Sequence, residues 1–569
     1  MNKYVPFGQI PLKKRSWPDN VISKAPVWCS VDLRDGNQAL PVPMTVEQKL
    51  EYFDLLVKIG FKEIEIGFPA SNNTEFNFVR RLIDEKRIPP DVSVQVLSQA
   101  REHLVRRTMQ AIAGAPKVIF HLYNAISPVQ REFTFGMSED ELVELAVEGV
   151  KNVKKYSKLA GLDTQIRLEY SPEDFSGADG NYAVRICSEV LKEWNPSADN
   201  PIIFNLPATV EHATPNIFAD QVEFFIDRMN ELTGSKEKKD AEGKICNGRV
   251  IVSIHNHNDR GTGIAACELG LLAGATRIEG TLFGNGERTG NLDMVAVALN
   301  MFTQGIETGL DFSQINSIAA EYTRLTGMQI PPRQPYCGSL VFTAFSGSHQ
   351  DAIRKALAER VRHPDSAWNI PYLPIDPKDV GREYEEIIRI NAQSGKGGTA
   401  WILETDYGII LPKGMLLYVG LAVKEKADGL QRELSSAEVY DVFKKGWLEN
   451  SGSIKLLDLA ETHVDGSAAA DNVLCRASVS INGKIFSIGA KGNGPLDAFA
   501  QALKQTPLPA YSVTAFHEHS VGSGNDTDAM AYVELNFENG IKQWGAGRSS
   551  NIGRAGINAV VSALNRFFD

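Results

Sequence analysis

The sequence has few cysteines, and none of them is arranged in pairs. Six cysteines are scattered over 569 residues without a CxxC spacing. They are Cys29, Cys187, Cys246, Cys267, Cys337 and Cys475. This distribution argues against a disulfide framework and against a structural zinc site, and it favours a reducing compartment such as the cytoplasm.

Long apolar runs and positive charge are also in short supply. The most apolar stretch, residues 407–423, is interrupted by Pro412 and Lys413, and the N-terminus has no apolar run that suits a signal peptide. We therefore expect no membrane span and a cytoplasmic protein. The net charge is −11. Because a nucleic-acid-binding face needs an excess of basic side chains, we expect no nucleic-acid partner.

The chain is too long for one hydrophobic core. Single cores stop growing at roughly 250–300 residues, and this sequence has 569. Its hydrophobic content of 43% and charged content of 23% are ordinary for a globular protein. Two or three domains are therefore expected.

The first half of the sequence alternates short β-branched runs with segments of helical periodicity. Eight such runs predict strands at 27–33, 61–68, 92–98, 117–123, 164–170, 201–206, 249–255 and 276–283. Strands that alternate with helices form parallel sheets, and eight units in about 280 residues suit a (β/α)8 TIM barrel. A doubly wound open sheet is the alternative, and the number of units disfavours it.

Polar side chains collect where these predicted strands end. In a TIM barrel the carboxyl ends of all strands meet at one face, where active sites lie. We therefore expect the polar residues at these ends to share one site. They are Arg34, Asp35, His121, Glu169, Glu173, Thr209, His255, His257, Asn285, Glu287 and Asn291.

Three of these residues form a candidate metal site. His255 and His257 lie two positions apart, and an extended backbone directs both imidazoles to the same side. Two imidazoles and the carboxylate of Asp35 suit zinc, manganese, iron or cobalt and leave positions open for substrate. The alternative is a pair of histidines bonded to neighbouring backbone. Asp259 is a candidate for orienting one of the two rings.

The other residues at this face have structural alternatives. His121 lies within an apolar strand, where a hydrogen-bonded core histidine is the ordinary interpretation. Glu169 and Glu173 also suit a solvated acidic pair. The glycines of residues 284–291 also suit a tight loop without a binding role. Only their predicted meeting point at the barrel mouth favours function.

The last third of the sequence, from about residue 434, contains an internal repeat. Two Asn-Gly hairpin turns, at 482–483 and 539–540, lie 57 residues apart, and each is followed by a glycine-rich loop and a helical pattern. Glycine-rich loops at helix starts expose backbone N–H groups that suit a carboxylate, although turn-forming glycines are the alternative. The glycines concerned are Gly489, Gly492, Gly494, Gly545 and Gly547.

Two motifs in the barrel segment resemble the signatures of 2-isopropylmalate and homocitrate synthases. They are LRDGNQ at 33–38, followed after ten residues by Lys49, and HNHNDRGTG at 255–263. Further blocks are similar to the long-form 2-isopropylmalate synthases. These are FNLPATVE (204–211), GNGERTGN (284–291), FSGSHQDAI (345–353), YLPIDPKDVGREY (372–384) and SGKGG (394–398).

The resemblance implies a fold and an activity for each part of the chain. It implies a TIM-barrel catalytic domain with an N-terminal extension at 1–327, helical linker subdomains at 328–433 and a leucine-binding regulatory domain at 434–569. The implied enzyme is an acyltransferase that condenses acetyl-CoA with 3-methyl-2-oxobutanoate to 2-isopropylmalate and CoA. This is the first committed step of leucine synthesis, inhibited by leucine.

The resemblance also implies roles for individual residues. A divalent cation (Mg, Zn or Mn) is held by Asp35, His255 and His257, with Asn291 close by, and potassium is a candidate activator. Arg34, His121 and Thr209 bind the keto acid. Glu173, His349 and Tyr384 are the candidates for proton transfer, and in this family His349 comes from the partner subunit of a homodimer. The five glycines become candidates for leucine binding.

Two alternatives stay open at this point. Citramalate and homocitrate synthases share the barrel signatures and differ in the pocket for the keto-acid side chain, where one methylene discriminates by only about 1–3 kcal/mol. A non-catalytic leucine sensor with a relic barrel belongs to a different class, and the retention of every expected ligand disfavours it.

Overall fold

The structure is a computed structural model that describes residues 7–162, 166–384, 396–430, 432, 434–449, 452–463, 473–521 and 527–568. The chain divides into two compact units. The first comprises Met1–Phe342 and Ile375–Glu383, and the second Thr343–Pro374 and Tyr384–Asp569.

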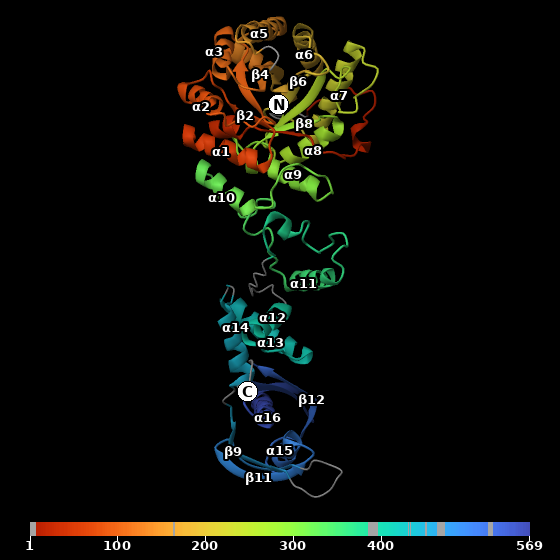
Figure 1. The fold of residues 1–569 in the computed structure, drawn as a ribbon. Helices are drawn as coiled ribbons and strands as arrows, with labels where there is room; N and C mark the ends of the chain where they lie inside the picture. Colours follow the sequence, from red (N-terminus) through yellow and green to blue (C-terminus); the bar gives the residue numbers. More distant parts are fainter. Residues whose placement is uncertain are drawn as a thin grey trace. The chain divides into compact units, whose positions relative to one another are not determined.

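In the described part of the first unit, eight parallel strands close into a barrel in sequence order, with β1 beside β8 (Figure 1). The strands are β1 (Val27–Ser30), β2 (Glu63–Gly67), β3 (Ser93–Gln99), β4 (Val118–Ala125), β5 (Ile166–Glu173), β6 (Ile202–Ala208), β7 (Val250–Asn256) and β8 (Arg277–Gly280). The predicted TIM barrel is confirmed. The predicted strand limits agree to within three residues at each end, although 164–165 lie outside the described residues.

Helices surround the barrel and follow each strand (Figure 1). They are α1 (Val46–Ile59), α2 (Asn73–Asp84), α3 (Glu102–Ile112), α5 (Glu139–Leu159), α6 (Gly180–Trp194), α7 (Pro215–Thr233), α8 (Gly263–Ala273) and α9 (Met294–Phe302). The short α4 (Pro128–Gln130) follows β4, and α10 (Ile315–Thr326) follows α9. Local signals set their limits. Thr45 and Gln48 form a capping box at the start of α1, and Gly60, at a φ of +117°, ends it.

The strand predicted at 27–33 is too long. β1 ends at Ser30, and residues Asp32–Gly36 form a single π-helical turn, η2. The carbonyl of Val31 accepts hydrogen bonds from the N–H groups of Arg34, Asp35 and Gly36 at 3.2, 2.9 and 3.2 Å. The apolar residues of this segment are buried in a turn rather than in the sheet, so periodicity alone does not distinguish the two.

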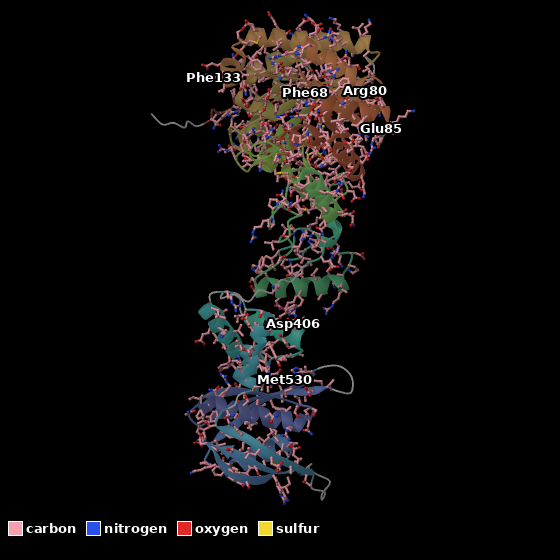
Figure 2. The ribbon with its side chains drawn as sticks, turned by 90° about the vertical axis from the view of Figure 1, so that its left-hand side faces the viewer. Phe68, Arg80, Glu85, Phe133, Asp406 and Met530 are labelled. Carbon is pink, nitrogen blue, oxygen red and sulfur yellow. The ribbon has the colours of Figure 1, made fainter. Side chains whose placement is uncertain are left out.

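The second unit begins with helices. They are α11 (Gly347–Arg362), α12 (Lys396–Tyr407), α13 (Lys413–Leu430) and α14 (Ser436–Phe443). Side chains of α12, α13 and α14 share one buried core with Met530, Tyr532 and Trp544 of a three-stranded sheet. Figure 2 labels Asp406 on α12 and Met530 on the sheet that these helices cover. The helices therefore form one body with this sheet.

The C-terminal repeat is confirmed as two copies of a three-stranded antiparallel sheet followed by a helix. The first copy has β9 (Ile454–His463), β10 (Val473–Ile481), β11 (Lys484–Gly492) and α15 (Pro495–Leu503); the second has β12 (Tyr511–Val521), β13 (Asp528–Phe537), β14 (Lys542–Ser549) and α16 (Ile552–Phe568). Apolar side chains of both copies fill a second core. The copies differ in one respect, because α12–α14 cover the outer face of the second sheet.

Some expectations are not tested by this architecture. The domain limits at 327 and 433 stay predictions, and residues 394–395 of the SGKGG block lie outside the described residues. Among the described helices, none has the length and apolar content to cross a membrane. Each of the six cysteines, all within the described ranges, is a buried free thiol.

Candidate metal centre and substrate pocket

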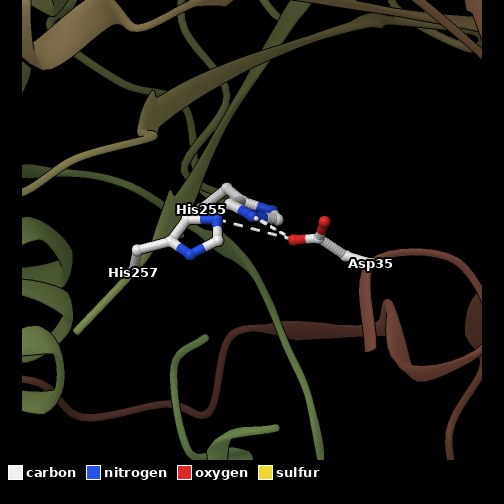
Figure 3. A group of neighbouring side chains, drawn as sticks. All are labelled: Asp35, His255 and His257. Carbon is white, nitrogen blue, oxygen red and sulfur yellow. Dashed lines mark ion pairs between the residues drawn. The ribbon is translucent and has the colours of Figure 1, made fainter. Parts of the chain in front are cut away.

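Asp35, His255 and His257 come together at the carboxyl end of the barrel (Figure 3). The Nε2 atoms of His255 and His257 lie 3.3 and 3.5 Å from Oδ2 of Asp35. All three side chains are buried. His255 lies on β7, His257 directly after it and Asp35 in η2, so two segments more than 200 residues apart build the cluster.

The hydrogen bonds around this cluster fit a cation. Nδ1 of His255 lies 2.9 Å from the carboxylate of Glu279 and donates to it, because a carboxylate only accepts. In the neutral ring, Nε2 then directs a lone pair at Asp35. Burial alone would lower the pKa of His255, but its contacts with the carboxylates of Asp35 and Glu279 raise it to about 9. A proton or a metal ion is therefore favoured between these groups.

Unpartnered acceptor atoms support the same interpretation. Oδ2 of Asp35 is buried and has no hydrogen-bond partner among the described residues. The same holds for Oδ1 of Asn291, whose backbone forms a β-bridge with His257. Such acceptors are costly to bury unless a cation or water satisfies them. The donor set of imidazole and carboxylate groups fits a divalent cation.

The turn η2 presents Asp35 and Arg34 together. Arg34 Nη1 lies 2.8 Å from Oδ1 of Asp35, and Arg34 Nε donates to Glu65 at 2.6 Å. Burial opposes ionisation of Asp35, but the neighbouring guanidinium of Arg34 holds its pKa well below the usual value. The carboxylate is therefore charged and ready to bind a cation.

A second group of buried polar residues, absent from the sequence-based set, lies inside the barrel. Glu279 accepts from His255, from Gln95 at 2.8 Å and from Asn205 at 2.9 Å. Arg277 lies 3.0 Å from Glu279. Burial opposes ionisation of Glu279, but the positive charge of Arg277 outweighs this effect and holds the pKa of Glu279 well below its usual value. The signal was available, because Arg277 and Glu279 alternate with apolar residues in a buried strand. Glu279, rather than Asp259, contacts a histidine ring; Asp259 pairs with Arg288 at 2.7 Å.

A cavity of about 160 Å³ opens beside the cluster. It brings together the predicted site residues Arg34, Asp35, His121, Glu173, Thr209, His255 and His257. Its other lining residues are Gln38, Leu97, Tyr123, Ser171, Asn205, Pro207, Glu287 and Arg288. The lining is polar on most sides, with Leu97 and Pro207 as its aliphatic members. This composition suits a small oxyacid with a short apolar part.

Three predicted residues lie at distinct places around this cavity. His121 is held by Glu65 at 2.8 Å from Nδ1 and by Ser171 at 2.7 Å from Nε2. Glu173 ends β5, and burial, together with the charge of Asp174, raises the pKa of its carboxyl group. Thr209 follows β6, and its hydroxyl accepts from the N–H of Asp174 at 2.9 Å.

His349 and Tyr384 belong to the second unit, whereas the residues that line the pocket belong to the first. The ring of His349 stacks on Tyr372, with centroids 4.0 Å apart and 24° between the planes. Their expected roles in proton transfer stay predictions.

The regulatory glycines have a packing explanation. A Cβ on Gly545 or Gly547 would collide with the backbone of α16, and one on Gly492 with the backbone of α15. Gly489 lies close to the carbonyl of Cys475, whereas Gly494, the residue before α15, faces open space. Close helix–strand packing thus accounts for three of the five glycines, and leucine binding by this set stays a prediction.

Fold and site together define a TIM-barrel enzyme class with a candidate His-His-Asp cation site at the carboxyl end of the barrel. Residues 25–321, more than half of the chain, match the family model described as HMGL-like. Residues 339–404 match the alpha-isopropylmalate synthase post-catalytic domain, and residues 433–568 match the LeuA allosteric (dimerisation) domain.

Relatives match the chain over its full length. The 2-isopropylmalate synthase of Clostridium acetobutylicum is 49% identical over 567 residues, which cover 99% of both chains. That of Acetoanaerobium sticklandii is 46% identical and covers 99% of this chain and 96% of its own. The mitochondrial 2-isopropylmalate synthase 2 of Saccharomyces cerevisiae is 45% identical, with 99% and 92% covered. The chain belongs to the 2-isopropylmalate synthase family, as the motifs predicted, and its cytoplasmic location stays a prediction.

Proposed function

We propose that the chain, an acyltransferase by family membership, condenses acetyl-CoA with 3-methyl-2-oxobutanoate to 2-isopropylmalate. A C–C bond forms between the acetyl methyl carbon and the keto carbon, and water then hydrolyses the thioester to release CoA. The observation that carries the proposal is the buried Asp35–His255–His257 cluster beside a cavity that also holds Arg34 and Glu173. The reaction opens leucine synthesis.

The pocket residues supply what this reaction needs. A divalent cation, when bound, supplies Lewis-acid polarisation of the keto-acid oxygens. Arg34 places a fixed positive charge where negative charge develops on the carbonyl oxygen. Glu173 is the candidate base for the acetyl methyl proton, and its raised pKa makes it a stronger base than an exposed carboxylate. His349 and Tyr384 are further candidates for proton transfer, with His349 provided by the partner subunit of a homodimer.

The cavity favours a keto acid with a short apolar side chain. The distal carboxylate of 2-oxoglutarate, the homocitrate synthase substrate, would need a spare cation. Among the described lining residues the guanidinium groups are those of Arg34, which is already assigned to the carbonyl oxygen, and Arg288, which pairs with Asp259 at 2.7 Å. Leu97 and Pro207 offer apolar contact instead. Pyruvate, the citramalate synthase substrate, is smaller and is discriminated by only about 1–3 kcal/mol per methylene.

A thiol-release assay tests the substrate. Acetyl-CoA is supplied with 3-methyl-2-oxobutanoate, pyruvate or 2-oxoglutarate, and the specificity constants are compared. We expect the highest value with 3-methyl-2-oxobutanoate. A higher value with pyruvate would favour citramalate synthesis, and no release with any keto acid would favour a non-catalytic leucine sensor. Repeating the assay after chelation and after adding back Mg, Zn or Mn, with and without potassium, identifies the ions used.

The C-terminal repeat supports leucine inhibition. The starts of α15 and α16 lie close together. A Cβ on Gly553, in the first turn of α16, would lie 3.3 Å from Pro495, the first residue of α15, and 3.3 Å from the carboxylate of Glu461. Leu496 and Phe516 lie 3.4 Å from the corresponding point on Gly556. Each part of leucine would find a suitable group here. The helix N-termini would attract its carboxylate, Glu461 would attract its ammonium group, and the apolar side chains would contact its aliphatic side chain. The candidate glycines Gly492 and Gly494 both precede the start of α15.

Inhibition assays test this site. We expect Glu461→Gln to weaken inhibition by leucine while the uninhibited rate stays at the parent value. Glu538→Gln, on an exposed turn of the same domain, is the matched control. Unchanged inhibition in the Glu461 variant would contradict this placement of the ammonium group. Light scattering of the full chain tests the proposed homodimer.

A further inference from the structure

The loops after β5 and β6 are joined by a pair of residues that do not line the pocket. We propose that Asp174 and His212 form a positioning pair that holds Thr209 and Glu173 in place for the keto acid and the acetyl group. The proposal rests on the proposed condensation, because it concerns the same pocket.

The backbone at Asp174 has an unusual conformation. Asp174 follows Glu173, the last residue of β5, and adopts a φ of +57° and a ψ of +39°. This left-handed conformation is uncommon for residues with a side chain, is tolerated best by Asp, Asn and Gly, and is often found at functional sites. It turns the N–H of Asp174 toward Thr209, whose hydroxyl oxygen accepts it at 2.9 Å.

The side chain of Asp174 is tied to the loop after β6. Nε2 of His212 lies 2.9 Å from Oδ1 of Asp174, and this hydrogen bond raises the pKa of His212. The carboxylate is 10% exposed and the imidazole 33%. The hydroxyl of Ser176 donates to the carbonyl of Val210 at 2.9 Å, which gives the two loops a second connection.

Gly177 lies next to both members of the pair. A Cβ on Gly177 would lie 2.6 Å from Nε2 of His212 and 3.2 Å from the second carboxylate oxygen of Asp174. The absence of a side chain at residue 177 therefore makes room for the pair.

Two consequences for the pocket follow from this arrangement. A hydroxyl that accepts an N–H bond still has its own proton to donate, so Thr209 is left to donate toward the cavity that it lines. Glu173 is joined directly to the constrained Asp174, whose charge, after burial, contributes most to raising the pKa of Glu173. The other charged groups that act on Glu173 are Arg34, which lowers its pKa, and Asp35, which raises it.

Substitutions of Asp174 separate conformation from charge. Asp174→Ala disfavours the left-handed backbone and removes the contact with His212, whereas Asp174→Asn tolerates that backbone and still accepts from His212. We expect Asp174→Ala to lower kcat/KM for the keto acid by about tenfold to a hundredfold, as small displacements of reacting groups do. Asp174→Asn should stay within about threefold of the parent. Both variants remove a negative charge, so the acid limb of the pH–rate profile should move to lower pH.

Substitutions of His212 test the same contact from the other side. His212→Ala removes the donor, whereas the side-chain amide of His212→Gln can still donate to Asp174. We expect the alanine variant to raise KM for the keto acid and the glutamine variant to restore most of the parent value. His103→Ala, which removes an exposed imidazole on α3, is the matched control and should be unchanged.

The outcomes distinguish this proposal from the proposed function. Binding of 3-methyl-2-oxobutanoate to the metal-loaded full chain, measured by calorimetry, accompanies each assay. If the parent releases CoA and both alanine variants match it, the positioning role is overturned and the condensation stands. If Asp174→Asn is as impaired as Asp174→Ala, charge rather than position is responsible, and the proposal also fails. A parent without activity overturns the proposed function, and keto-acid binding by the variants then decides the positioning role.

Discussion

At the scale of single residues, His255 depends on a carboxylate that does not face the cation site. Glu279 accepts from Nδ1 of His255 and so directs the lone pair on Nε2 toward Asp35. Groups that orient a ligand histidine in this way typically change metal affinity by about 10- to 100-fold when they are altered. The metal site is therefore larger than its three candidate ligands.

We predict that Glu279→Gln weakens metal binding by about 10- to 100-fold. The amide oxygen still accepts from His255, but the charge that makes the ring more basic is lost. A titration with Mn²⁺ followed by electron paramagnetic resonance measures the affinity. Glu287→Gln, at the rim of the cavity, is the control, since its carboxylate bonds to Gln38 rather than to a ligand. Parent-like affinity in a folded Glu279→Gln protein would contradict the assigned role.

At the scale of elements, the turn that carries Asp35 is held from below by α1 and α2. Lys49 on α1 is fully buried; its ammonium group pairs with Glu75 on α2 and lies 3.4 Å from the carbonyl of Leu33. A Cβ on Gly67, at the end of β2, would collide with the Glu75 carboxylate. Lys49, which follows the LRDGNQ block after ten residues, therefore contacts the backbone of η2 and does not line the pocket.

We predict that Lys49→Met lowers both metal affinity and the free energy of unfolding. Removing one partner of a buried ion pair costs roughly 3–5 kcal/mol. The double variant Lys49→Met/Glu75→Gln should recover part of the free energy of unfolding but not the metal affinity. Urea unfolding and Mn²⁺ titration measure the two effects. The control Lys62→Met breaks an exposed pair with Asp91 and should cost under about 1 kcal/mol. If affinity returns in the double variant, the charge of Lys49 has no part in shaping the turn.

At the scale of the whole molecule, the chain has separate cores. The barrel belongs to one compact unit, and the cores of the helices α12–α14 and the C-terminal sheets belong to the other. The candidate cation ligands all lie in the barrel unit. Ligand binding stabilises the folded state of the body that binds it.

We predict two thermal transitions, one for each unit. A divalent cation should raise the melting temperature of the barrel unit only. Scanning calorimetry with and without Mn²⁺ separates them. Gly547→Ala should lower the melting temperature of the other transition only. The free energy of unfolding of that unit should fall by roughly 1–3 kcal/mol, because the added Cβ would overlap the backbone of α16. Gly429 lies near the end of α13 with open space around it. Gly429→Ala should raise the free energy of unfolding of the same unit by up to about 1 kcal/mol. A single transition that moves as a whole would contradict independent unfolding.

Much of this protein follows from the sequence by itself. The period of the apolar residues determined eight strands and their helices, and the His255–His257 spacing with Asp35 determined the candidate cation site, because strand ends in a parallel barrel must converge. The paired Asn-Gly turns determined the repeat. The motifs determined the family.

Other features were decided only by the tertiary structure. The contact of Glu279 with His255 and the Asp174–His212 pair join side chains that lie 24 and 38 residues apart in the sequence, and the end of β1 at Ser30 depends on hydrogen bonds to the carbonyl of Val31. Periodicity reports which side of an element is buried, but not which buried polar groups meet there. Hydrogen-bond geometry, which operates over about 3 Å, selects those partners only once the barrel has closed.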